Sequence, residues 1–155
     1  MLTEQTRSEA FIEFARSAEP RLRHALCAAF GPDAGRDAAA ESLAFAWEHW
    51  DRVAAKPNPV GYLGGVGRTK ARRSLRRRPI GFPEPVRIGV PWVEPALPAA
   101  LAGLTERQRT AVLLVHGLQW TLSEVADVMG IAKTSAQNHL ERGMRRLRSD
   151  LGVER

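Results

Sequence analysis

Residues 121–151 hold the pattern that most limits the fold of this chain, two helix signals separated by a single glycine. Thr121, followed three residues later by Glu124, is a capping box in which each side chain can satisfy a backbone donor at a helix start. Gly130 predicts the end of that helix, because glycine adopts the left-handed conformation without a Cβ clash. A second helix follows directly. The pattern therefore predicts a helix-turn-helix.

Each of these two helices has one apolar face. The apolar positions recur three or four residues apart: Leu122, Val125, Ala126 and Met129, then Ala136, Leu140, Met144, Leu147 and Leu151. The other face of the second helix is polar and basic, and its N-terminal half carries the side chains we expect to reach DNA: Lys133, Thr134, Ser135, Gln137, Asn138 and Arg142. Gln and Asn amides match the adenine edge, whereas Arg and Lys reach guanine or phosphate. The alternative is a solvated helix on an ordinary bundle, and the basic outer face favours DNA binding.

The charge of the chain agrees with a nucleic-acid partner but does not select one. The formal net charge is +6 over 155 residues, and such a chain is attracted to polyanions because counterions are released from phosphates. An acidic membrane or an acidic protein would attract it too, so the placement of the charge must decide. Glu4 and Glu9 interrupt the N-terminus and no apolar run reaches membrane-spanning length. We therefore expect a soluble protein.

The first half of the chain predicts helices. Apolar spacing from residue 8 to residue 30 predicts two of them, with a break at Pro20. Residues 37–51 predict an amphipathic helix with Leu43, Trp47 and Trp50 in the core. Its other face carries an acidic ridge, Asp37, Glu41 and Glu48. A solvated helix surface explains that ridge equally well, because carboxylates near a helix N-terminus are favoured by its dipole.

Residues 60–78 predict a further helix, weak at its start and strongly basic at its end. Gly64, Gly65 and Gly67 each cost about 1 kcal/mol relative to alanine. The cations that follow are Arg68, Lys70, Arg72, Arg73, Arg76, Arg77 and Arg78. The helix dipole would account for cations in the last turn alone. The whole run indicates phosphate contact.

Residues 79–98 hold six of the ten prolines and predict an extended linker. The linker would join two small helical domains, residues 1–78 and 99–155, and so the fold class is all-α. Thr105 and Gln108 form another capping box, which predicts a helix through His116. His24 and Cys27 have the spacing of two metal ligands, but no second pair completes a site. We expect no metal, no cofactor and no enzymatic activity, because paired carboxylates and activated nucleophiles are also missing from the sequence.

These features together resemble the sigma-70 factors of bacterial RNA polymerase, in the small extracytoplasmic-function group. DAAAESLAFAW at residues 37–47 is similar to their region two, with Ala40 where Gln is usual. PVGYL and VGR at residues 59–68 resemble the helix that holds the melted promoter element. Thr69 and Arg73 depart from that pattern, and so do the three glycines. LTERQR, SEVA, MGI and LERGMRRL, between residues 104 and 147, are similar to region four. Ala132 replaces a usual Ser cap, so we expect Thr134 to cap the second helix.

The resemblance implies a role for each of these groups. Asp37 and Glu41 would dock on core RNA polymerase. The second helix of the helix-turn-helix, the recognition helix, would read the upstream promoter element. Tyr62 and the cations Arg68, Lys70, Arg72, Arg73, Arg76 and Arg77 would hold the melted element. Core packing is an equally good role for Tyr62. The implied location is cytoplasmic, at the bacterial nucleoid, with promoter DNA as a partner, an anti-sigma factor as a further candidate, and no membrane.

Two functions compete on these grounds. The first is a sigma factor that directs core polymerase to specific promoters and initiates transcription. The second is a sigma-like DNA-binding regulator that no longer recruits core polymerase, which the departures at Ala40 and Arg73 and the glycine-rich helix suggest. Copurification with core polymerase separates the two.

Overall fold

The fold is taken from a computed structural model that describes residues 3–76 and 94–153. Arg77, Arg78 and most of the predicted linker lie outside these ranges. The described residues form helices and no strand: α1 (Glu4–Phe30), α2 (Pro32–Glu48), α3 (Trp50–Ala54), α4 (Pro59–Leu75), α5 (Leu97–Ala102), α6 (Glu106–Val112), the π-helical turn η1 (Leu113–Gly117), α7 (Leu122–Met129) and α8 (Lys133–Asp150). The all-α prediction is confirmed. We call α1–α4 the N-terminal bundle and α5–α8 the C-terminal bundle.

Helix α1 continues through Pro20, and the predicted break there is wrong. Proline inside a helix removes one backbone hydrogen bond and costs about 3 kcal/mol. The buried stripe of α1 runs on both sides of this position, with Ala18 and Leu22 both fully buried. Packing along the whole stripe therefore offsets the cost of the proline.

Helix α2 begins at Pro32, five residues before the predicted start, and it buries a different face from the predicted one. Its buried positions are Gly35, Ala38, Ala39, Ser42 and Ala46. Trp50, which α3 carries, is buried as predicted, whereas Trp47 is 39% exposed. The Trp47 ring lies 5.2 Å from that of Phe11 and 5.5 Å from the Arg7 guanidinium carbon. Small residues bring α2 close to α1, and the large aromatic side chain packs at the edge of this contact.

Helix α4 lies across the N-terminal bundle and begins with a side-chain cap. The Asn58 side chain accepts a hydrogen bond from the Gly61 amide at 3.0 Å, and Pro59 occupies the first turn, where its missing N–H costs nothing. Val60 and Leu63 are buried. The helix ends at Leu75, which is three residues before the predicted end.

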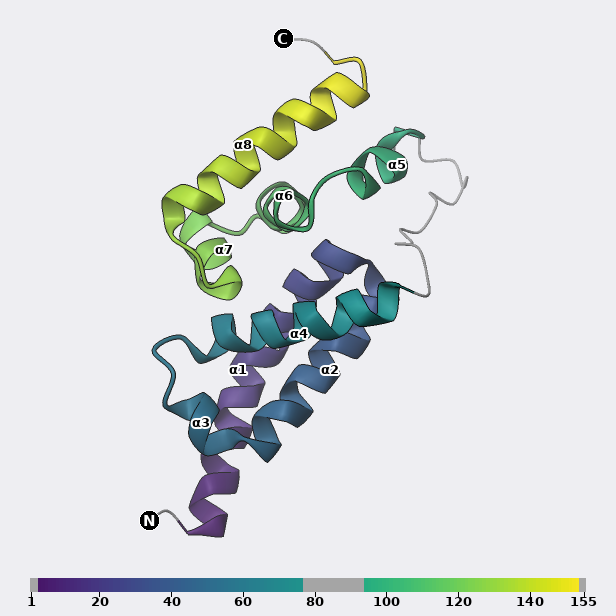
Figure 1. The fold of residues 1–155 in the computed structure, drawn as a ribbon. Helices are drawn as coiled ribbons and strands as arrows, with labels where there is room; N and C mark the ends of the chain where they lie inside the picture. Colours follow the sequence, from purple (N-terminus) through teal and green to yellow (C-terminus); the bar gives the residue numbers. More distant parts are fainter. Residues whose placement is uncertain (1–2, 77–93, 154–155) are drawn as a thin grey trace.

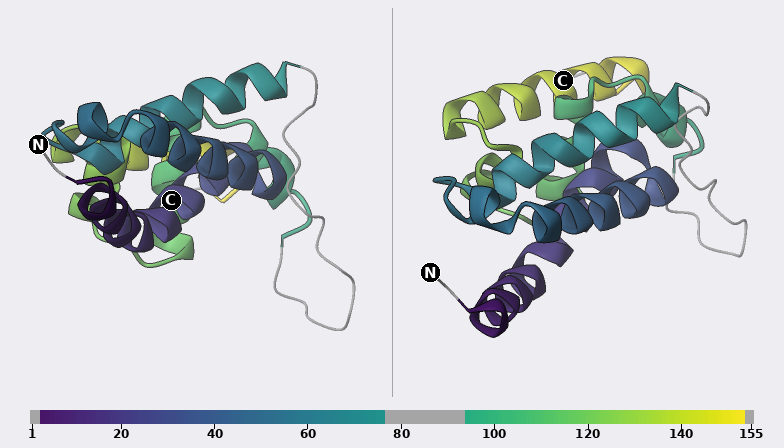
Figure 2. Two further views of the ribbon diagram at one scale, coloured as in Figure 1. Left: turned by 90° about the horizontal axis from the view of Figure 1, so that it is seen from below. Right: turned by 60° about the horizontal axis from the view of Figure 1, so that its bottom comes forward.

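The C-terminal bundle packs against α1 and α4 of the N-terminal bundle, as Figures 1 and 2 show from three directions. One continuous cluster of buried apolar side chains runs through both bundles, from Leu22 and Leu26 to Leu114, Val125 and Val128. A second, smaller cluster joins α5 to α8 through Leu101, Leu104 and Leu147. The helices on either side of the Pro-rich segment thus share a core. Helix α5 begins at Leu97, inside the range predicted as linker.

Candidate nucleic-acid interface

Helices α7 and α8 form the predicted helix-turn-helix. The Thr121 hydroxyl accepts from the Glu124 amide at 3.2 Å and so caps α7. Gly130 takes the left-handed conformation (φ 66°) that ends α7, and the Ile131 amide donates to the Ala126 carbonyl at 3.0 Å. That pattern of glycine and reversed hydrogen bonds closes the carbonyl end of a helix. The turn therefore fixes the direction in which α8 leaves α7.

The N-terminal half of α8 presents the predicted base-reading side chains to solvent. Lys133, Thr134, Gln137, Asn138 and Arg142 are exposed, and Ser135 is half-buried. Gln137 donates to the Glu141 carboxylate at 3.1 Å. The expectation that Thr134 caps α8 is wrong, because the cap position is Ala132 and Thr134 lies inside the helix. The first turn of α8 thus starts without a side-chain acceptor.

No motif or spacing in the sequence marks His139, which lies on the same helix. Its side chain is half-buried, and burial lowers the pKa of His139, with Arg107 and Arg142 acting in the same direction. The ring is therefore neutral at neutral pH. Arg107 is an exposed cation of α6 beside the recognition helix, in the RQR motif.

The predicted arginine run of α4 divides between two surroundings. Arg73 and Arg76 are exposed. Arg72 donates two hydrogen bonds to Glu106 of α6, and burial lowers the pKa of Arg68, with neighbouring Arg107 adding to that effect. Lys70 lies 3.7 Å from Glu41, so the cationic run meets the acidic ridge between α4 and α2. Arg77 lies outside the described residues.

Tyr62 is half-buried on α4. Its ring centroid lies 6.3 Å from that of Phe45, and the Lys56 ammonium stands 4.7 Å above the ring. The Arg52 guanidinium donates to its hydroxyl at 3.4 Å. One face of the ring thus packs on the bundle, and the rest lies among cations at the surface.

The acidic ridge of α2 lies on the surface. Asp37, Ala40 and Glu41 are all exposed. Their face is opposite the buried positions of α2, and so substitutions there leave the core untouched. Within this ridge, Glu41 forms an ion pair with Lys70 of α4.

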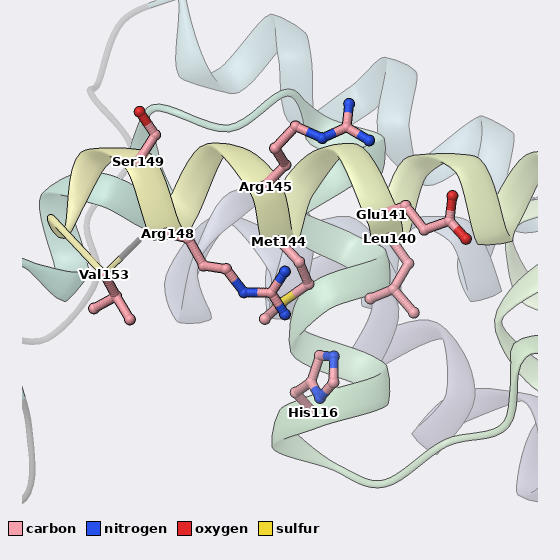
Figure 3. A pocket seen from close by; sticks show the side chains of 8 residues that line it. All are labelled: His116, Leu140, Glu141, Met144, Arg145, Arg148, Ser149 and Val153. Carbon is pink, nitrogen blue, oxygen red and sulfur yellow. The ribbon is translucent and has the colours of Figure 1, made fainter. Parts of the chain in front are cut away.

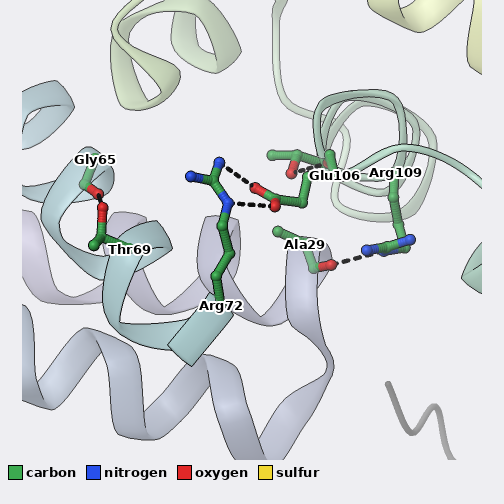
Figure 4. A network of polar contacts seen from close by, with 7 residues as sticks. Ala29, Gly65, Thr69, Arg72, Glu106 and Arg109 are labelled. Atoms are coloured by element: carbon green, nitrogen blue, oxygen red, sulfur yellow. Dashed lines mark hydrogen bonds and ion pairs between the residues drawn. The ribbon is translucent and has the colours of Figure 1, made fainter. Parts of the chain in front are cut away.

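A buried arginine, Arg109 of α6, joins the two bundles (Figure 4). Its guanidinium donates to the Ala29 carbonyl at 2.7 Å, and to the carbonyls of Leu101, Ala102 and Leu104 at 2.8 to 3.3 Å. Only 2% of the residue is exposed, and burial lowers the pKa of its guanidinium. Ala29 lies in the last turn of α1, where carbonyls lack partners within the helix. The Arg side chain therefore caps α1 from another bundle.

A hollow runs along the far side of α8, toward η1 (Figure 3). It has a volume of about 690 Å³, and its lining combines Leu140, Met144 and Val153 with the polar side chains of His116, Glu141, Arg145, Arg148 and Ser149. An apolar groove of about 470 Å³ continues from it between α5 and α8. The hollow adjoins the predicted base-reading side chains at Glu141, which accepts a hydrogen bond from Gln137.

His24 and Cys27 have other neighbours in the structure. The Cys27 thiol donates to the Pro32 carbonyl at 3.6 Å, and the His24 ring lies 6.1 Å from that of Trp120. Over residues 3–76 and 94–153, no group of three or more His, Cys, Asp and Glu side chains could hold a metal ion. In the same ranges, no helix has the length and hydropathy needed to cross a membrane.

Comparison with known proteins agrees with this geometry. Residues 95–147 match the family model described as Sigma-70, region 4. No curated protein matches the sequence. Among solved structures, the fold is similar to that of the sigma factor RpoE in complex with the anti-sigma factor NepR from Bartonella quintana, with a TM-score of 0.61 and 22% identity over 95% of this chain and 99% of that chain. The similarity in fold thus extends over both bundles.

Proposed function

We propose that this chain, a sigma-70 family protein by its region 4 segment and its fold, acts as a sigma factor that brings core RNA polymerase to specific promoters. The helix-turn-helix carries the proposal. Its recognition helix is held by the Gly130 turn and exposes Lys133, Gln137, Asn138 and Arg142 within the segment that matches region 4. Such side chains can read base edges in a major groove.

The N-terminal bundle would hold the melted promoter element. The exposed Arg73 and Arg76 supply phosphate contacts, with Arg68, Lys70, Arg72 and Arg77 as further members of the run. Tyr62 supplies an aromatic ring flanked by Lys56 and Arg52, and stacking of a base on such a ring adds about 1 to 3 kcal/mol. Binding of single strands by stacking and charge is tolerant of sequence, so specificity would come mainly from α8.

Core polymerase would dock on the acidic ridge. Asp37 and Glu41 lie one helical turn apart and are exposed, which suits recognition by a basic surface. Ala40, exposed between them, offers no hydrogen bond. That gap supports the second candidate, a DNA-binding regulator that has lost polymerase recruitment. Either function places the protein in the cytoplasm with promoter DNA, and an anti-sigma factor is a further proposed partner of the first.

Run-off transcription with purified core polymerase tests the proposal. A sigma factor copurifies with core polymerase and gives transcripts of defined length from its own promoters. A stand-alone regulator binds the same DNA without copurifying and supports no transcript. A variant with alanine at both Gln137 and Asn138 serves as the control for polymerase binding. It should copurify with core polymerase but lose its preference for specific promoters.

A further inference from the structure

His139 lies where the recognition helix α8 packs on α6. Gly143, one turn further along α8, makes this contact close, since a Cβ there would stand 2.8 Å from Cγ2 of Val112 and 3.3 Å from the Gln108 carbonyl oxygen. His139 and Gly143 are four residues apart and so share one face of α8. The imidazole is half-buried, and its neighbour on α6 is Arg107, the residue before Gln108. The packing of α8 on α6 therefore holds the ring beside Arg107.

The same imidazole borders the exposed side of the recognition helix. Asn138 precedes it, Arg142 follows one turn later, and both are exposed. An α-helix with its side chains is about 10 to 12 Å across, and the major groove of B-DNA is about 12 Å wide. A helix that enters the groove therefore has phosphates close to both of its edges. His139 lies at one such edge of α8.

Arg107, His139 and Arg142 form a group that we call the basic cluster. Both arginines lower the pKa of His139, because each acts on the ring as a nearby positive charge. Within residues 3–76 and 94–153, none of these three side chains makes a hydrogen bond or an ion pair. Two cations and a histidine thus lie together without an anion between them.

The acidic side chains around α8 do not balance the basic cluster. On α6, α7 and α8 these are Glu106, Glu124, Asp127, Glu141 and Asp150, and α5 carries no charged residue. Glu106 binds Arg72, and Glu141 accepts from Gln137. Among the described residues, the charges that act on the pKa of His139 are Arg107 and Arg142 alone.

We propose that His139 binds a phosphate of the DNA backbone together with Arg107 and Arg142, and that the ring takes up a proton as the DNA binds. A neutral imidazole has one N–H donor, whereas the protonated ring has two and a full positive charge. The phosphodiester brings the negative charge that the basic cluster has no source of in the described chain. The inference rests on the proposed function, because it takes duplex DNA as the ligand of α8.

Proton uptake follows from the change in the surroundings of the ring. In the free chain, burial and the two arginines oppose a third positive charge. An opposite charge within about 4 to 6 Å favours the charged form and shifts a pKa by about 1 to 3. Binding therefore tightens as the pH falls through the pKa of the bound ring, and it levels off below the pKa of the free ring. A difference of one between these two pKa values makes binding about tenfold tighter at the acid limit.

Titration of the full chain with a fluorescent duplex of random sequence measures this coupling. The range runs from about pH 8 to about pH 5.5, on either side of the ordinary histidine pKa. We expect the affinity to rise roughly five- to tenfold toward the acid end. The log–log salt slope should be steeper there by about 0.9, because one more cation contacts phosphate. An affinity that does not change with pH overturns the inference.

Two substitutions of His139 should act in opposite ways. His139→Gln keeps a hydrogen-bond donor without a charge, so its affinity and its salt slope should be equal at both ends of the range. His139→Arg carries a fixed charge, and so at about pH 8 it should bind as tightly as the parent does at the acid end. His49→Gln, at an exposed position of the N-terminal bundle, is the control and should keep the pH dependence of the parent. The inference fails if His139→Gln keeps it too.

NMR titration of the imidazole protons measures the pKa of His139 directly. Addition of the duplex should raise this pKa, and Arg107→Gln should raise it in the free chain, because one opposing charge is gone. This measurement decides if His139→Gln loses helicity by circular dichroism, and a pKa that the duplex leaves unchanged contradicts the inference. Inorganic phosphate at the same ionic strength is the second probe. An equal rise with phosphate alone would make this a site for free phosphate and overturn its assignment to the DNA backbone.

The duplex titration needs no polymerase, so its outcome is separate from that of run-off transcription. If the parent transcribes with core polymerase but binds duplex equally at every pH, the sigma function stands and this inference fails. If binding takes up a proton at His139 and transcription fails, the inference stands and the sigma function fails. A parent that binds no duplex at any pH overturns both.

Discussion

Two nitrogens of the Arg72 guanidinium, on α4, donate hydrogen bonds to the Glu106 carboxylate of α6, at 2.6 and 2.9 Å. The planar guanidinium uses the same two-pronged geometry for phosphate. Glu106 therefore occupies the donors that a DNA backbone would use. Because 54% of the Arg72 side chain is exposed, the pair itself adds no more than about 1 kcal/mol to stability. A polyanion can displace it.

Removing the exposed arginines of α4 should flatten the salt dependence of DNA binding. Each lost phosphate contact lowers the log–log slope by about 0.7 to 0.9, so Arg73→Gln with Arg76→Gln should lower it by about 1.4 to 1.8. Arg16→Gln with Arg36→Gln removes the same charge from exposed positions elsewhere. Equal slopes for the two double variants would show that the arginines of α4 are solvated and do not contact phosphate. Filter binding or fluorescence anisotropy at salt concentrations between about 50 and 200 mM gives the slopes.

Alanine at Gln137 or Asn138 should weaken binding to a cognate upstream element by about 1 to 3 kcal/mol, because a base-edge contact is lost. Binding to random duplex should hardly change, since phosphate contacts remain. Ser149→Ala, exposed at the other end of α8, serves as control. Competition titrations measure the ratio of cognate to random affinity, and a ratio equal to that of the parent contradicts base reading.

Reversing the acidic ridge should separate polymerase docking from DNA binding. Asp37→Lys with Glu41→Lys should shift the unfolding free energy by roughly 0.5 kcal/mol or little more, because both side chains are exposed. Docking on a basic surface should lose several kcal/mol. Glu9→Lys with Glu13→Lys repeats the spacing and the charge change on α1. Copurification with core polymerase is the measurement, and retention by the ridge variant at the level of the α1 variant would falsify the docking face.

The helix-turn-helix, both of its apolar stripes and the capping box at Thr105 could be predicted because each depends on neighbours within one or two turns. The junction of the two bundles could not. Arg109 and Ala29 are 80 residues apart, and nothing local marks Gly61 and Gly64 as points of contact with α7. The prediction that Trp47 lies in the core is wrong for a related reason. Small residues of α2 make the close contact with α1, whereas the large apolar residues dominate the periodicity of the sequence.

The stability of the protein should fall as the pH drops below about 6.5. His139 has a lowered pKa in the folded chain, so the unfolded chain binds its proton first. The contribution is complete above the ordinary histidine pKa and is lost as the pH falls through the folded value. His139→Gln should remove that part of the acid dependence. Thermal midpoints between pH 7.5 and about 5, which spans the ordinary histidine pKa, test this, and an equal acid dependence in the parent and the variant would contradict it.

Arg109→Met should lower the unfolding free energy by about 2 to 4 kcal/mol, because carbonyls of Ala29, Leu101 and Leu104 lose a buried charged donor. Arg107→Met, two residues away and exposed, should change it by about 0.5 kcal/mol at most. Urea titrations followed by circular dichroism give both values. Equal losses for the two variants would show that the buried guanidinium adds nothing to the junction of the bundles.

The cap that Arg109 places on α1 also sets an order of events during synthesis. Ribosomes add roughly 5 to 20 residues per second, and the donor for the Ala29 carbonyl is made 80 residues later. For about 4 to 16 seconds the nascent α1 therefore has an incomplete end, and its Leu22 and Leu26 face has only the helices of its own bundle to cover it. The N-terminal bundle therefore completes its packing only after the C-terminal bundle has been made.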